Sequence, residues 1–129
     1  MKELLVIYGE TDGTATTGTL SLNSDLFQAT VSNIRIPRGA KAKIWFKKIS
    51  GEAETLFTLK YTHDVTVATI TWLNLQQEKL ASKGEIAIEK RRPSILRGLT
   101  GNEAIQITWT QPTAAKAYAE LGLELTDEE

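Results

Sequence analysis

The chain has 129 residues, a net charge of −1 and no cysteine, which fits one globular domain. The missing cysteine excludes disulfides, thiolate metal sites and cysteine nucleophiles, and the single histidine excludes metal sites that need two imidazoles from one chain. Hydrophobic residues make up 41%, enough for a packed core. The balance of 15 basic against 16 acidic residues lacks the basic excess of a general nucleic-acid binder.

Residue usage and turn spacing both predict strands. The chain contains 17 Thr, 11 Ile and 4 Val, whose branched side chains suit the pleated surface of a sheet. Clusters of Gly, Pro, Asn, Asp and Ser divide it at fairly even intervals. The expected strands are 3–8, 15–22, 27–36, 41–49, 54–61, 65–75, 84–90 and 103–110. About eight short strands predict an all-β fold, an antiparallel β-sandwich of the jelly-roll type.

Two internal stretches depart from the strand pattern. Residues 75–83 combine several helix formers and are followed by Gly84, so a short helical turn is a candidate there. Residues 90–97 are basic and are interrupted by Pro93, which favours an edge strand or a loop.

The character of the sequence changes again after Pro112. Thr113 could cap a short helix, and the end of the chain is acidic. We therefore expect a β-sandwich domain over 1–112 and a C-terminal acidic arm over 113–129, a short helix plus tail that is not a separate domain. The arm could complement a basic surface or could be a solubilising tail.

The clearest candidate interaction surface lies on the basic strand 41–49. Strand alternation places Ala42, Ile44 and Phe46 on one face, and Trp45 on the other face together with Lys41, Lys43, Lys47 and Ile49. A large aromatic side chain among cations on a solvated face is unusual for a purely structural residue. Trp45 could stack on a protein partner, a sugar or a base, or it could pack under lysine stems or a neighbouring loop.

A second part of the candidate surface comes from Trp72. The predicted strand 65–75 that holds it is apolar on both faces, so either the C-terminal arm or another subunit should cover the second face. Arg91 and Arg92, from the basic segment, complete the candidate surface. Trp109, by contrast, shares a face with isoleucines and is expected in the core.

No residue pattern indicates catalysis. His63 and Asp64 would suit a metal site only with further histidines, so a turn is the simpler interpretation. No serine has the flanking glycines of a nucleophile elbow. Glu85 and Glu89 alternate with isoleucines, as on any half-buried strand, rather than forming a glycosidase pair. We therefore expect no enzyme activity and no catalytic, cofactor-binding or metal-binding residue.

Charge is segregated along the chain. Residues 35–48 hold six cations and no acid, whereas residues 120–129 hold five acids and no base. Such a chain can complement itself, within one subunit or between copies, and attraction of this kind biases register more than it adds affinity.

These features favour a non-enzymatic structural protein that self-associates. We expect a homo-oligomer such as a trimer, or a subunit that builds or decorates a larger protein array, as virion decoration subunits do by architectural analogy. The alternative is a small carbohydrate- or ligand-binding module in which Trp45, Tyr61 and Trp72 form a stacking platform. Nucleic-acid binding ranks behind both. The sequence shows no signal peptide or transmembrane segment, so we expect synthesis in a cytoplasm, no membrane partner and a virion as one destination.

Overall fold

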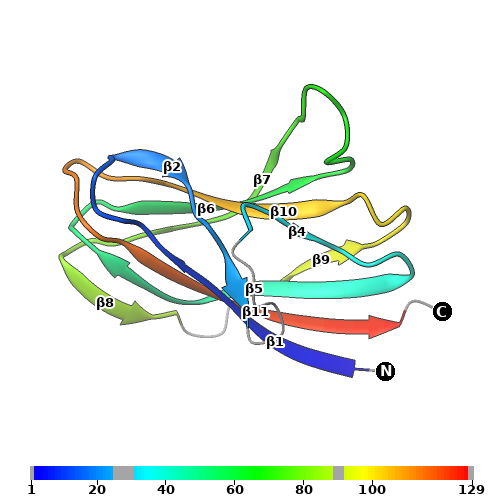
Figure 1. Ribbon diagram of the computed structural model, residues 1–129. Coiled ribbons are helices and arrows are strands. Elements are labelled where there is room, and N and C mark those ends of the chain that lie inside the picture. The colour runs from blue at the N-terminus through cyan, green and yellow to red at the C-terminus, as the bar shows by residue number, and fades with distance from the viewer. Residues whose placement is uncertain (1, 25–30, 89–91, 128–129) are drawn as a thin grey trace.

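The computed structural model describes residues 2–24, 31–88 and 92–127, which form strands, turns and loops (Figure 1). The strands are β1 (Lys2–Glu10), β2 (Thr17–Thr19), β3 (Asn23–Ser24), β4 (Ile34–Arg35), β5 (Ala40–Gly51), β6 (Leu56–Thr62), β7 (Leu73–Lys79), β8 (Gly84–Ala87), β9 (Ser94–Arg97), β10 (Ala104–Thr110) and β11 (Tyr118–Asp127).

These strands form two antiparallel sheets. The first, sheet 1, has the order β3-β1-β11-β5-β8, and β9 also pairs with β5. The second, sheet 2, has the order β2-β10-β6-β7, and β4 also pairs with β10. Figure 1 shows the two sheets as facing layers. The predicted all-β, antiparallel, sandwich-like fold is therefore confirmed.

The core lies between the two sheets because burial alternates along their long strands. On β5, Ala42, Ile44 and Phe46 are buried, while Lys43 and Trp45 between them stay partly exposed. On β10, Ile105, Ile107 and Trp109 are buried and join the same cluster. The predicted core position of Trp109 and the predicted inward positions of Ala42, Ile44 and Phe46 are confirmed. Ile49, predicted on the outer face, is instead buried, because the register shift of β5 against β11 past Phe46 inverts the alternation.

The predicted helical C-terminal arm is wrong. No helix occurs in the part of the chain that the structure describes, and Tyr118–Asp127 form β11, which pairs with β1 on one side and β5 on the other. Ala119, Leu121 and Leu123 alternate with outward-facing residues and are buried in the core. This period-two pattern outweighs the helix propensity of the segment's Ala, Leu and Glu residues. The last described residues are thus part of the sandwich, not an arm attached to it.

The predicted strand 65–75 is wrong for residues 65–72, and only its last three residues lie in a strand, β7. Residues 63–72 form the β6–β7 loop, which rises away from both sheets in Figure 1. The chain leaves β6 at a turn in which the Asp64 carboxylate accepts hydrogen bonds from the backbone N–H (2.9 Å) and hydroxyl of Thr66. The alternation of Thr and apolar residues in this segment is typical of a strand, but the segment forms a loop. Residues 65–72 therefore provide no doubly apolar strand for an arm or a second subunit to cover.

The candidate helical turn at 75–83 is replaced by the strand β7. This edge strand of sheet 2 is tied to sheet 1 by Gln76, whose side-chain amide donates to the Ile44 carbonyl (3.1 Å) and to Ser94 Oγ (2.8 Å). A helical turn could not present the Gln76 side chain to sheet 1 while its backbone pairs with β6. The segment around Pro93 leads into β9, an edge strand, as the proline indicated.

The loop between β9 and β10 is held by a buried carboxylate. Glu103 accepts hydrogen bonds from the backbone N–H groups of Leu99 (2.9 Å), Thr100 (3.2 Å) and Gly101 (3.0 Å). Burial raises the pKa of Glu103, but these backbone hydrogen bonds stabilise the ionised form and hold the pKa below its usual value. The ionised form therefore contributes to the stability of the fold.

We expect Glu103→Gln to destabilise the protein by about 1–3 kcal/mol at pH 7, because the amide group replaces one acceptor oxygen with a donor. A depressed pKa in the folded state means that the carboxylate's contribution is complete above its unfolded pKa of about 4.3 and is lost as pH falls through the folded value. Urea unfolding of the wild type and of the Glu103→Gln variant, at pH 7 and at about pH 3, measures the difference in their free energies of unfolding. An equal difference at both pH values would contradict the account.

Candidate functional site

Trp45 lies on the outer face of sheet 1, as the alternation of β5 predicted. Its side chain is half-buried because the indole lies on Gly122 of the neighbouring strand β11. A Cβ atom at Gly122 would overlap the Cε2 and Cζ2 atoms of the indole. The ring therefore packs on the backbone of the neighbouring strand.

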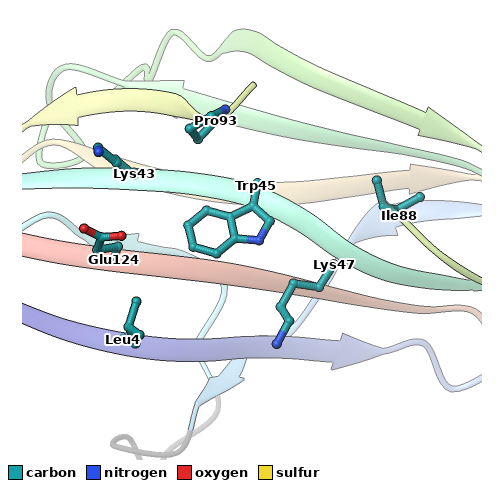
Figure 2. Close-up of a pocket in the computed structure, with 7 residues that line it drawn as sticks. All are labelled: Leu4, Lys43, Trp45, Lys47, Ile88, Pro93 and Glu124. Atoms are coloured by element: carbon teal, nitrogen blue, oxygen red, sulfur yellow. The ribbon is translucent and has the colours of Figure 1, made fainter. Parts of the chain in front are cut away.

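The indole forms the floor of a shallow hollow of about 540 Å³. The hollow is lined by Leu4, Lys43, Trp45, Lys47, Ile88, Pro93 and Glu124. Figure 2 shows the indole between β5 and β11, with Lys47 reaching across β11 toward β1. Leu4 is 68% exposed, which is high for a leucine on a sheet face. The hollow thus combines an apolar floor and wall with charges of both signs.

The structure brings together part of the predicted surface. Lys43 and Lys47 line the hollow with Trp45, and Lys41 lies on the same face but outside it. Trp72 belongs to the β6–β7 loop, which extends from sheet 2, so it is not part of this surface. Arg92 is exposed but does not line the hollow, and Arg91 lies outside the described residues.

Sequence reasoning missed the residues that β1 and β11 contribute. Leu4 and Glu124 reach the hollow because β1 pairs with β11 and β11 with β5. The outward position of Leu4 could have been read from the alternation in β1. The position of Glu124 could not, because its strand was expected to be a helix and tail.

The segregated charges meet within one subunit. Lys43 on β5 lies directly across from Glu124 on β11, and Lys48 lies across from Glu120. Neighbouring strands therefore pair a basic row with an acidic row on one sheet face. Charge segregation alone gives no argument for a second copy.

Other polar groups are used in local structure. The Tyr61 hydroxyl lies 3.2 Å from Nδ1 of His63, next to the Asp64 turn, so the predicted turn at His63 and Asp64 is confirmed. The Tyr118 hydroxyl donates to the Glu120 carboxylate at 2.8 Å. Burial, with this hydrogen bond, raises the pKa of Tyr118 and keeps it a neutral phenol.

Comparison of the chain with family models, with curated proteins and with solved structures finds no match. Among the residues that the structure describes, no three His, Asp or Glu side chains gather closely enough to hold a metal ion. Nor does that part of the chain contain a helix long and apolar enough to cross a membrane. The outer face around Trp45 is thus the candidate site that geometry supports.

We expect Gly122→Ala to displace the indole of Trp45, because the new methyl group overlaps the ring. Overpacking of this kind costs about 1–3 kcal/mol. Thermal unfolding gives the loss of stability, and the indole N–H resonance of Trp45, assigned with Trp45→Phe, shows the displacement. In a Trp45→Ala background the same glycine substitution should cost much less. Equal costs in both backgrounds would show that the ring is not what excludes a side chain.

Proposed function

We propose that this protein is a non-enzymatic structural subunit, a self-associating β-sandwich that builds or decorates a larger protein array, with a virion decoration role by architectural analogy. The observation that carries the proposal is the apolar hollow floored by Trp45 on the outer face of sheet 1. Protein interfaces place aromatic side chains at a desolvated centre and charged groups at a polar rim. Trp45 and Leu4 supply such a centre, and Lys43, Lys47 and Glu124 supply such a rim.

The proposal includes the jelly-roll form of the sandwich. The strands pair as a nested series: β6 with β7, β5 with β8 and β9, β10 with β2 and β4, and β1 with β11. Successive pairs in this series alternate between sheet 2 and sheet 1. A long antiparallel ribbon wound around a core gives this order, and jelly rolls are common in capsid subunits. The strand order supports the architectural analogy, and an analogy of fold does not by itself assign a function.

The alternative function is a small carbohydrate- or ligand-binding module. Its expected platform, Trp45 with Tyr61 and Trp72, is divided between the outer face of sheet 1, sheet 2 and the β6–β7 loop. A row of aromatic rings for sugar stacking is therefore not assembled from these three residues. This geometry favours the structural role over the alternative.

We expect the purified protein to exceed the monomer mass in solution, with a mass that rises with protein concentration and falls with added salt. The apolar centre drives association and the charged rim makes it sensitive to ionic strength. Light scattering behind a sizing column, at two salt concentrations and over a range of protein concentrations, measures this. A monomer under all of these conditions would contradict self-association and direct the search to glycans and other protein partners.

A further inference from the structure

We infer that the outer face of sheet 1 binds the same face of a second copy, around a two-fold axis parallel to the strands and midway between β11 and β5. This inference rests on the proposed self-association and adds the surface, the partner and the symmetry. It would give a dimer as the basic unit, not the trimer that the sequence suggested.

The basis is the order of side chains across the face. Three rows of cross-strand neighbours run from β1 through β11 to β5 and beyond. The first row is Leu4, Glu124, Lys43 and Ile95; the second is Val6, Gly122 and Trp45; the third is Tyr8, Glu120, Lys48 and Ala87. The first and third rows read uncharged, acidic, basic, uncharged. When either row is reversed about the line between β11 and β5, each uncharged end falls on the other uncharged end. The acidic position then falls on the basic one.

A two-fold axis along that line places β5 of one copy over β11 of the other. Lys43 then faces the second copy's Glu124, and Lys48 faces the second copy's Glu120. Each ion pair occurs twice, because a two-fold contact repeats every interaction. No other placement of the axis between adjacent strands of this face sets both basic positions against both acidic ones.

The same axis also matches the apolar side chains. Leu4, on β1, comes to face the second copy's Ile95, on β9. Leu4 is 68% exposed and Ile95 is 52% exposed, so both leave a large apolar surface in water in the single chain. In the second row the two indoles come side by side near the axis, each on its own Gly122. Aromatic side chains at the centre of an interface contribute most of its affinity.

The matched area is limited in extent. The row beyond Tyr8 has Glu10 at one end and Glu85 at the other, so the two-fold axis would set these like charges against each other. The eleven positions of the three rows span about 360 Å² per copy, from strand spacings of about 4.8 Å and rises of about 3.4 Å per residue. Such an area is small, so we expect a weak dimer whose population depends on concentration.

The test exchanges charge between the facing positions. In a dimer of identical chains, Lys43→Glu alone sets a carboxylate against Glu124, and Glu124→Lys alone sets an ammonium group against Lys43. We expect each variant to weaken dimerisation at least about tenfold. Mixing the two variants should restore it, because positions 43 and 124 then carry opposite charges in both facing pairs. Sedimentation velocity of each protein and of the equimolar mixture measures this, with circular dichroism to show that each variant is folded.

Matched controls carry the same charge changes on the opposite side of the sandwich. Lys79→Glu and Glu54→Lys disrupt an exposed ion pair of 2.6 Å beside β7 and should leave dimerisation unchanged. If wild-type protein stays monomeric, self-association itself fails. If it associates and the single variants associate equally well, the proposed function stands and this face is wrong. Weakened single variants that the mixture does not restore would overturn the two-fold arrangement.

Discussion

The sandwich depends on the hydrogen-bonded insertion of β11 between β1 and β5. Residue pairs run without interruption from Lys2 with Thr126 to Glu10 with Tyr118 on one side. On the other side β11 pairs with β5 along its length, with one register shift between Glu120 and Leu121. Both neighbours are remote in sequence, so the entropy of closing long loops must be offset by these pairings and by the core that they complete.

The candidate surface follows from the same insertion. β11 places Gly122 beside Trp45, and only a residue without Cβ lets the indole lie flat on the strand. β11 also brings Glu120 and Glu124 next to the lysines of β5. A neighbouring strand with a larger residue than glycine beside Trp45 would leave the indole projecting between lysines. That is the arrangement that the sequence alone indicated. The buried backbone, the tryptophan and the charge rows are therefore three consequences of one strand pairing.

The fold class, the faces of β10 and those of β5 as far as Lys47 could be predicted because their side chains alternate with period two. The register shift that turns Ile49 into the core could not. β11 could not, because Ala, Leu and Glu favour helices locally and its partners lie about 75 and 115 residues away in sequence. The β6–β7 loop was misread for the opposite reason. Its Thr and apolar residues alternate as in a strand, although the turn at Asp64 has already ended β6. Register across sheet 1, which assembles the site, depends on long-range pairing that local patterns do not contain.

The arrangement of charge on sheet 1 also bears on the register in which two copies would pack. A face with exposed Leu4 and Ile95 but no charge would associate in many registers. Contacts displaced along the strands lack a two-fold axis, so the two copies bury different parts of the face. On this face such a displacement moves Lys43 and Lys48 away from the carboxylates of β11. The alternating acidic and basic positions thus favour the symmetric contact over the displaced ones, while the apolar side chains supply the attraction.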